Sequence, residues 1–463
     1  MKFVMKNMGP LRYAEFEPND LTIISGRNNT GKTYATYGAY GFLKRWNRYI
    51  QFDFLESDID TLFRNGNIFI DDATIIENIP KIVDKLNKNY SNNLYSIFGS
   101  PAKTYEKSYF DIFLDENDIL FNKEFEHKVF SGDDNLVISA SSSEDKNGID
   151  VVLIDYENTK ELPRFILEDV VKQIVSNYTF SRLFPNVFIL SAERTGASIF
   201  RQELDFSRNR LLSEIHNLKS TNLSSISSLL NKVDSSYALP VEDNVDYIRR
   251  LEDVAKNESY LSVEHPEIIK FFEEISEGVF SVGKNNELFY SPQSKKSLKL
   301  PMDDSSSSVR SLLALGFYLK HTARRGDMLI IDEPELNLHP DNQRKMARII
   351  AMLVNTNLKV FITTHSDYLV KELNTLIMLN RNGDIEKEVM GTEGYSNREL
   401  LDPSRVSAYY IGEKRVEIPG NRSKTKIKTL VKSEVKKDTG IHINSFDNAI
   451  DEMNRVQDLL LWG

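Results

Sequence analysis

An eight-residue segment near the start of the chain constrains the fold more than any other feature of the sequence. The segment GRNNTGKT (Gly26–Thr33) has two glycines five positions apart, followed directly by a lysine and a threonine. The apolar run before it, Leu21–Gly26, is typical of a buried strand, and Lys32–Trp46 after it has apolar residues at helical spacing. A glycine-containing turn between a buried strand and a helix predicts an α/β core.

The residue types of this turn fit a triphosphate. Gly26 and Gly31 lack the Cβ atoms that would block a close approach, so loop N–H groups and the helix N-terminus can face an anion. Lys32 then places a positive charge on the β- and γ-phosphates, and the Thr33 hydroxyl can coordinate Mg²⁺. A chance glycine turn is the alternative. The pattern predicts a P-loop that binds ATP and Mg²⁺ through Gly26, Arg27, Asn28, Asn29, Thr30, Gly31, Lys32 and Thr33.

A second motif, LIIDEPE (Leu329–Glu335), brings two carboxylates to the end of another apolar run. This run predicts a buried strand whose carboxyl end lies beside an adjacent P-loop, where Asp332 would hold Mg²⁺ directly or through water. Glu333 follows at once and is placed to polarise the attacking water. The alternative for an acidic pair after a strand is a solvated turn.

A histidine closes the next apolar run. His365 ends VFITTH, 33 residues past Asp332, and two parallel strands that end side by side would bring it near the γ-phosphate. There it could donate a hydrogen bond to the phosphate and orient the water, although a lone histidine is more often structural.

Four consecutive serines, Ser305–Ser308, open the apolar helix that precedes the acidic strand. One interpretation is helix capping by serine. The other is a second anion-binding helix start, too far from its own P-loop to serve it and therefore serving the P-loop of a neighbouring subunit.

The rest of the chain predicts further loops, hairpins and helices around the core. Asparagine-rich stretches within 47–105 look like loops, 108–156 alternates like antiparallel hairpins, and 446–462 has the spacing of an amphipathic helix. We expect five segments: an N-terminal part of the ATPase head with the P-loop (1–104), a β-rich part (105–200), a helical insertion (201–278), the core with serines, acidic strand and histidine strand (279–400), and a basic segment with the closing helix (401–463).

Taken together, the motifs resemble the ABC-class ATPases, in the RecF, SMC and OLD branch rather than among membrane transporters. In that class SSSSVR stands where the signature motif stands, which implies that Ser306 or Ser307 contacts the γ-phosphate of ATP held by the opposite subunit. ELNLHP (Glu335–Pro340) stands where the D-loop stands. The resemblance implies an ABC-type head with an antiparallel β subdomain and a helical insertion, working as a homo-oligomer built from ATP-sandwich dimers.

Within that branch, LSAERTG (Leu190–Gly196) looks like the PAERxG element of stand-alone prokaryotic ATPases of the AAA_15 type. Several of these belong to anti-phage defence, and size and layout resemble the AriA-like ATPases of PARIS systems. The resemblance implies a sensor of a phage trigger protein that holds and releases a separate TOPRIM-type, AriB-like nuclease, and a higher ring such as a hexamer. SSSS lacks the glycines of the commoner signature, and Gln51 is the candidate for the Q-loop glutamine.

Other features leave alternatives open. Net charge is −10, yet Glu413–Lys437 has nine Lys/Arg against three Glu, so a RecF- or SMC-type DNA-binding ATPase competes with a partner-docking surface. A nucleotide-gated scaffold with little turnover is the third reading. Arg194 could reach phosphate or an interface, or pair with Glu193.

The absence of cysteine, of a signal sequence and of a long apolar run leads us to expect a cytoplasmic protein without a membrane span. No D-x-D pair follows Asp367, so we expect any nuclease to be a separate partner.

Overall fold

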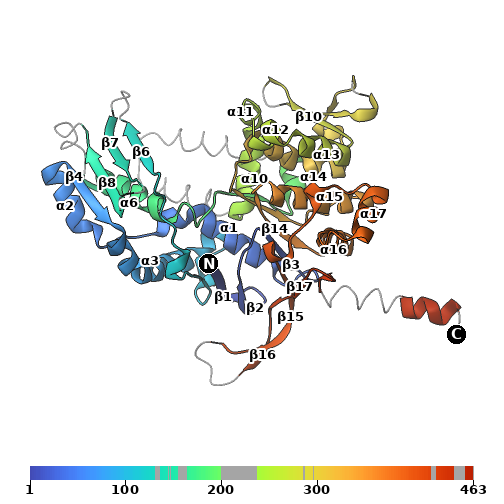
Figure 1. The fold of residues 1–463 in the computed structure, drawn as a ribbon, viewed down its shortest axis with the longest axis horizontal. Coiled ribbons are helices and arrows are strands. Elements are labelled where there is room, and N and C mark those ends of the chain that lie inside the picture. Colours follow the sequence, from blue (N-terminus) through green and yellow to red (C-terminus); the bar gives the residue numbers. More distant parts are fainter. Residues whose placement is uncertain are drawn as a thin grey trace, which may run out of the picture. The chain divides into compact units, whose positions relative to one another are not determined.

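The computed structural model describes residues 1–130, 136–143, 145, 147–154, 164–199, 237–284, 287–295, 297–418, 424–442 and 454–461 (Figure 1). Contacts divide the chain into two compact units, each assembled from segments that are far apart in the sequence. The first unit comprises Met1–Val4, Phe42–Asn93 and Tyr109–Pro185, and the second comprises Met5–Gly41, Leu94–Ser108 and Asn186–Gly463. The predicted α/β fold is confirmed.

The first unit is built on a four-stranded antiparallel sheet of order β4-β8-β7-β6. The hairpins expected within 108–156 are therefore present. Asp72 is buried at the start of α3, where it accepts a hydrogen bond from the Tyr178 hydroxyl (2.6 Å) and pairs with Lys123. Its elements are α2 (Leu55–Asn65), β4 (Asn67–Asp71), α3 (Asp72–Asn92), β5 (Tyr109–Phe113), η2 (Glu116–Asp118), β6 (Glu126–Phe130), β7 (Leu136–Ser141), β8 (Gly148–Leu153) and α6 (Arg164–Phe180).

The expectation of loops in the asparagine-rich part of 47–105 is wrong. Helix α3 alone spans 21 residues there, and it continues through Pro80. Its buried residues follow helical spacing (Ile75, Ile79, Ile82, Leu86 and Tyr90), which outweighs the low helix propensity of asparagine. At least one asparagine has a specific role, because the Asn87 amide donates to Ile112 O and accepts from Ile112 N, both at 2.9 Å.

The second unit is organised around a six-stranded sheet of order β16-β15-β3-β14-β13-β9. Only the outermost pair, β15 with β16, is antiparallel in this sheet; the other neighbours run parallel. Every residue of β3 and β13 is buried, as expected for central strands covered on both faces. The six strands are β3 (Leu21–Ser25), β9 (Val187–Leu190), β13 (Met328–Asp332), β14 (Lys359–Thr364), β15 (Val406–Val416) and β16 (Thr425–Lys432).

Helices and short strands complete this unit. The short strands expected after the helical insertion form a separate sheet of order β10-β11-β12. The elements are β1 (Lys2–Met8), β2 (Leu11–Phe16), α1 (Lys32–Tyr49, which continues into the first unit), α4 (Leu94–Phe98), η1 (Ala102–Tyr105), α7 (Arg194–Ile199), α10 (Leu239–Arg249), α11 (Leu251–Val254), α12 (Tyr260–Glu264), α13 (Pro266–Ser276), β10 (Gly278–Val282), β11 (Leu288–Pro292), η4 (Gln293–Lys295), β12 (Leu300–Pro301), η5 (Met302–Asp304), α14 (Ser307–Phe317), the π-helix η6 (Tyr318–Thr322), α15 (Pro340–Asn355), α16 (Asp367–Leu379), α17 (Asp384–Glu393), η7 (Asn397–Glu399), η8 (Pro403–Arg405), β17 (Val435–Lys436) and β18 (Gly440–Ile441).

The tail of the chain adds a strand to the central sheet. β15 is the direct parallel neighbour of β3, with Tyr410 opposite Ser25. Of the basic segment 413–437, residues 413–416 and 425–432 pair with each other or with the rest of the antiparallel β15–β16 ladder, and 435–436 form β17 in a separate sheet. Of the predicted closing helix, 454–461 is helical and exposed, whereas 446–453 lies outside the described residues, as does 201–236 of the predicted insertion. Among the described residues, no helix has both the length and the apolar character that a membrane crossing requires.

Candidate functional site

The predicted P-loop lies between β3 and α1, in the strand–turn–helix context that the sequence indicated. Gly31 has a φ of +112°, and a Cβ there would lie 2.9 Å from Leu11 Cγ. At Gly26 a Cβ would meet Thr30 Oγ1 at 3.1 Å and Ile411 Cβ at 3.3 Å. Side chains at either glycine would therefore intrude on packed atoms, and Gly31 also needs a backbone conformation that L-residues rarely adopt.

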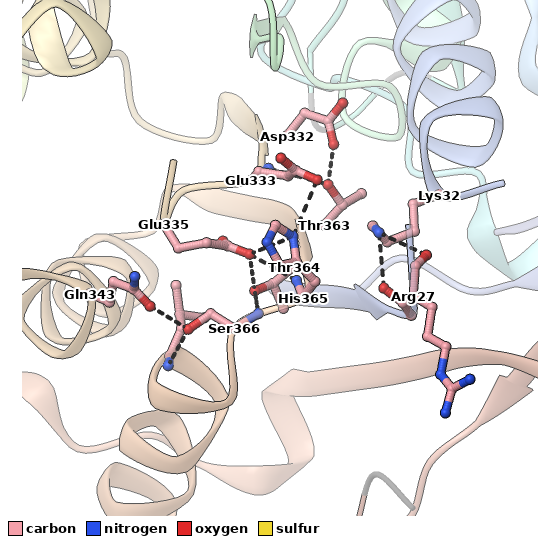
Figure 2. A network of polar contacts seen from close by, with 12 residues as sticks. Arg27, Lys32, Asp332, Glu333, Glu335, Gln343, Thr363, Thr364, His365 and Ser366 are labelled. Atoms are coloured by element: carbon pink, nitrogen blue, oxygen red, sulfur yellow. Dashed lines mark hydrogen bonds and ion pairs between the residues drawn. The ribbon is translucent and has the colours of Figure 1, made fainter. Parts of the chain in front are cut away.

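Lys32 is the first residue of α1, and its ammonium turns back over the loop (Figure 2). The Nζ atom donates to the carbonyl oxygens of Gly26 (2.9 Å) and Arg27 (3.2 Å) in a buried position. Both partners are neutral, so the lysine charge is not cancelled by these contacts and is available to an anion in the loop. Thr33 is exposed beside it. In Figure 2 the Arg27 side chain points away from this cluster.

Asp332 ends β13 and is almost completely buried. The Thr363 hydroxyl of the neighbouring strand β14 donates to its carboxylate. The pKa of Asp332 is raised to about 6, chiefly by burial and also by the charges of Glu333 and Glu193, while the Thr363 hydrogen bond and the Arg194 charge oppose the rise. A carboxylate held in such surroundings gains from a nearby cation.

The acidic strand β13 is the next but one to the P-loop strand β3, an order that the sequence motifs did not specify. β14 lies between them, with Thr364 opposite Ser25 on one side and Thr363 opposite Asp332 on the other. The carboxyl ends of β3, β14 and β13 therefore line up at one edge of the sheet. This alignment brings the P-loop, His365 and the Asp332–Glu333 pair to the same edge.

Glu333 turns the chain sharply after the strand. It is a non-glycine residue with a φ of 54°, and its N–H donates to Thr363 O at 3.1 Å. Its carboxylate Oε1 lies 3.3 Å from His365 Nδ1. The hydrogen bond from His365 lowers the pKa of Glu333, aided by the charges of His365 and Lys32, so this carboxylate is ionised at neutral pH.

His365 lies between two carboxylates, as Figure 2 shows. Its Nδ1 is 3.3 Å from Glu333 Oε1 and 3.3 Å from Glu335 Oε1, and the side chain remains 43% exposed. Both carboxylates raise the pKa of His365, with the Glu333 hydrogen bond as the largest cause. The imidazole is therefore oriented by its carboxylate partners and keeps an open side.

Glu335 was not among the predicted site residues. It is buried and accepts hydrogen bonds from the Thr364 hydroxyl and from His365 N–H, both at 2.8 Å. Its Oε2 is buried without a hydrogen-bond partner. The sequence signal for Glu335 is a third acidic residue two positions after Glu333, at the start of ELNLHP.

The four serines begin α14. Ser306 is its N-cap and accepts a hydrogen bond from Val309 N (3.3 Å), so the capping role is present. Ser306 and Ser307 are exposed, while Ser305 is buried. A contact of the two exposed serines with a partner's nucleotide stays a prediction.

Arg194 occupies neither of the roles expected from the sequence. Instead of contacting Glu193 or solvent, its buried guanidinium donates to four main-chain carbonyls, those of Ser191 (3.0 Å), Asp332 (2.7 Å), Glu333 (2.7 Å) and Ser311 (3.1 Å). Burial lowers the pKa of Arg194 to about 10, which leaves it charged at neutral pH. The local sequence could not reveal this, because three of the four acceptors are more than 100 residues away.

Tyr37 and Glu193 form a hydrogen-bonded pair near the site that the sequence did not indicate. The Tyr37 hydroxyl of α1 donates to Glu193 Oε2 at 2.8 Å, and burial raises the pKa of Tyr37. The Glu193 charge is one of those that raise the pKa of Asp332, so Glu193 belongs to the electrostatic surroundings of the site. Gln51 is an exposed residue of the first unit, and its Q-loop role stays a prediction.

The residues present fit a nucleotide with a divalent cation. The loop lies at the N-terminus of α1, where free N–H groups favour an anion, and Lys32 adds a positive charge that its carbonyl contacts do not cancel. The Thr33 hydroxyl and the Asp332 carboxylate offer the hard oxygen ligands that Mg²⁺ prefers. The raised pKa of Asp332 also favours a bound cation, because a cation would stabilise the charged form of this carboxylate.

Asp332→Asn should stabilise the protein in the absence of nucleotide. Because the pKa of Asp332 rises from 3.8 to about 6 on folding, the wild-type protein loses stability as pH rises through this interval. The asparagine still accepts from the Thr363 hydroxyl, so at pH 7–8 the free energy of unfolding should increase by up to about 3 kcal/mol.

Thermal unfolding between pH 4 and 8 checks this. The gain should vanish towards pH 4, and the exposed Asp438→Asn control should show no such dependence. Equal melting temperatures of Asp332→Asn and wild type at pH 7.5 would contradict the buried-charge account.

Comparisons with known proteins place the chain. A family model described as AAA ATPase domain (AAA_15) matches residues 1–370, and no curated protein matches. Similar solved structures include an SMC head bound to the C-winged helix domain of ScpA, at 11% identity and TM-score 0.33, with 93% of this chain and 97% of that chain covered. Another is the Smc head domain with an extended coiled coil bound to the C-terminal domain of ScpA from Pyrococcus furiosus, at 11% identity and TM-score 0.32, covering 98% of each chain. A third is the SMC head domain from Thermotoga maritima, at 10% identity and TM-score 0.30, with 94% of this chain and 98% of that chain covered.

Because these TM-scores lie below 0.5, the family assignment depends on the family model, which spans most of the chain. The chain belongs to the AAA ATPase domain family.

Proposed function

We propose that this protein is an ABC-class ATPase that hydrolyses ATP at an interface between two of its copies and thereby regulates a separate effector nuclease in anti-phage defence. The observation that carries the ATPase part is the convergence of P-loop, Asp332, Glu333 and His365 at one edge of a parallel sheet. These residue types, a phosphate-binding loop with its lysine, a carboxylate for the metal ion and groups that position water, are the ones that phosphoryl transfer to water uses.

Each residue has a defined task in the proposed reaction. Lys32 and the loop N–H groups would hold the phosphates, and Thr33 with Asp332 would hold Mg²⁺, which would neutralise developing negative charge. Glu333, ionised at neutral pH, accepts the proton of the attacking water. His365, fixed by Glu333 and Glu335, orients that water and donates to the γ-phosphate.

The proposed second subunit docks through the exposed start of α14. Ser306 and Ser307 lie at the N-terminus of an 11-residue helix, where the helix dipole and free N–H groups favour an anion. The partner's triphosphate would supply that anion. Sandwich dimers of this kind could assemble further into a ring such as a hexamer.

The regulatory role is argued from the sequence, chiefly from the element LSAERTG. LSAERTG resembles the PAERxG element of defence ATPases, and the size and layout of the chain resemble the AriA-like ATPases of PARIS systems. We therefore assign the nuclease step to a TOPRIM-type, AriB-like partner, and the signal to a phage trigger protein.

Ser307→Arg tests the subunit interface. The exposed arginine should leave ATP affinity within about twofold, because it does not touch its own P-loop, but should block ATP-dependent association by filling the docking surface. Mass measurement with and without Mg-ATP, combined with an ATPase assay, reads both properties. ATP-dependent association of Ser307→Arg equal to that of wild type would remove α14 from the interface, and wild-type turnover near background would favour a nucleotide-gated scaffold instead.

A DNA-binding repair ATPase is the second candidate, and the β15–β16 hairpin is the observation that favours it. Arg415 and Lys426 face each other across the hairpin, and Lys428 lies on the same face opposite Glu413. Lys426 is partly neutralised by an ion pair with Glu413 (2.6 Å). Duplex DNA binding that weakens steeply with salt would support this reading, because phosphate contacts release counterions.

A further inference from the structure

We propose that Arg194 is a positioning residue that couples the start of α14 to the conformation of Glu333. This inference rests on the proposed function, because it assigns a task to Arg194 within that reaction. Three parts of the second unit meet at its guanidinium: the turn after β9 through Ser191 O, the acidic turn through Asp332 O and Glu333 O, and helix α14 through Ser311 O.

The shape of the arginine side chain explains why it can join three segments. Guanidinium carries five N–H groups in a planar fork. Here Nε donates to α14, Nη2 donates to the acidic turn, and Nη1 donates both to the acidic turn and to the turn after β9. Lysine would keep the charge, but its donors all lie on one atom and cannot reach separated acceptors in the same way. The geometry of the fork, and not its charge alone, is therefore what the site uses.

One of these contacts acts on the residue proposed to activate water. Glu333 has a left-handed backbone (φ 54°), a conformation that a non-glycine residue keeps only where its surroundings hold it. Its N–H is held by Thr363 O at 3.1 Å and its C=O by Arg194 Nη2 at 2.7 Å. With both main-chain groups fixed, the carboxylate is directed at His365.

The other end of the link lies on α14. Ser311 is close to one turn beyond the exposed Ser307, and its carbonyl accepts from Arg194 Nε at 3.1 Å. Its hydroxyl lies within hydrogen-bond distance of Leu336 O (3.2 Å) and Ser308 O (2.8 Å). A subunit that docks on the start of α14 therefore acts on a helix that is bonded to both sides of the acidic turn.

The expected consequence is that association stimulates turnover only when this link is intact. In the wild-type protein, specific ATPase activity should rise with protein concentration as sandwiches form. In Arg194→Lys, ATP affinity should stay within about twofold and ATP-dependent association should persist, but turnover should fall about 10- to 100-fold and become independent of protein concentration. The split between binding and turnover separates positioning from a general loss of structure.

The experiment measures binding of a fluorescent ATP analogue, turnover across protein concentrations and mass with Mg-ATP. The exposed Arg250→Lys serves as the matched control. Turnover of Arg194→Lys that rises with concentration as in wild type overturns the inference while the proposed ATPase stands. Wild-type protein that neither hydrolyses ATP nor associates overturns the proposed function itself.

A second variant keeps the inference testable if Arg194→Lys does not fold, as judged by circular dichroism. Ser311→Ala retains every Arg194 contact but removes the hydroxyl link to the acidic turn. Its turnover should fall about fivefold, the factor expected for one hydrogen bond, with ATP affinity unchanged. Unchanged turnover and concentration dependence in Ser311→Ala would then overturn the coupling.

Discussion

Glu333→Gln should bind ATP normally, hydrolyse it about 10²- to 10⁴-fold more slowly and accumulate as the ATP-bound, associated form. The magnitude is the usual contribution of a general base, which the amide cannot replace because it does not accept a proton. Single-turnover hydrolysis, nucleotide binding and mass measured on the same sample give the three quantities. Because the pKa of Glu333 is lowered, the wild-type carboxylate should stay ionised through the neutral range. Glutamine has no ionisable group at this position, so higher pH should not restore turnover in Glu333→Gln.

The surroundings of Glu333 allow this substitution without a change of fold. Glutamine keeps an Oε1 that accepts from His365 Nδ1, and the main chain stays held by Thr363 and Arg194. Glu277 offers a control with the same backbone conformation, since it is left-handed like Glu333, with a φ of 52°, and lies exposed on the surface. Glu277→Gln should leave turnover unchanged. Normal turnover in Glu333→Gln would remove it from the proposed mechanism.

The parts of the site that could be predicted are those encoded by contiguous motifs. The P-loop, the Asp332–Glu333 pair and His365 each follow a short run of buried apolar residues, and such runs predict strands whose ends carry the polar groups. Parallel pairing of these strands then places the groups at one edge, although the order, with β14 between β3 and β13, does not follow from the motifs.

The parts that could not be predicted depend on contacts between distant segments. β15 joins the sheet beside β3 from 385 residues away, as its Val406–Leu21 pairing shows, and its outer half has the charged composition of a solvated loop. Arg194 has a local sequence that favours ion pairing, yet its partners are carbonyls that only tertiary structure brings together. In α3 the apolar residues have helical spacing in the sequence, and this spacing outweighs the asparagine content, which favours loops.

Lys32→Ala should lose ATP affinity by about 100-fold or more. Hydrogen bonds to a charged group contribute up to about 3 kcal/mol each, and loss of one such contact already corresponds to a factor above 100. The substitution removes the ammonium that Gly26 O and Arg27 O hold over the loop, and the glycines and Thr33 remain in place. Titration of a fluorescent ATP analogue measures the affinity, with the exposed Lys387→Ala as control.

Ligand-induced stabilisation gives an independent check of the same prediction. A ligand that binds only the folded state adds RT ln(1 + [L]/Kd) to stability, so Mg-ATP should raise the melting temperature of wild type and Glu333→Gln but not of Lys32→Ala. The three proteins together separate binding from chemistry, because Glu333→Gln keeps the shift and loses turnover whereas Lys32→Ala loses both. A full Mg-ATP shift in Lys32→Ala would mean that the nucleotide binds elsewhere, and the alignment of β3, β14 and β13 would then need another explanation.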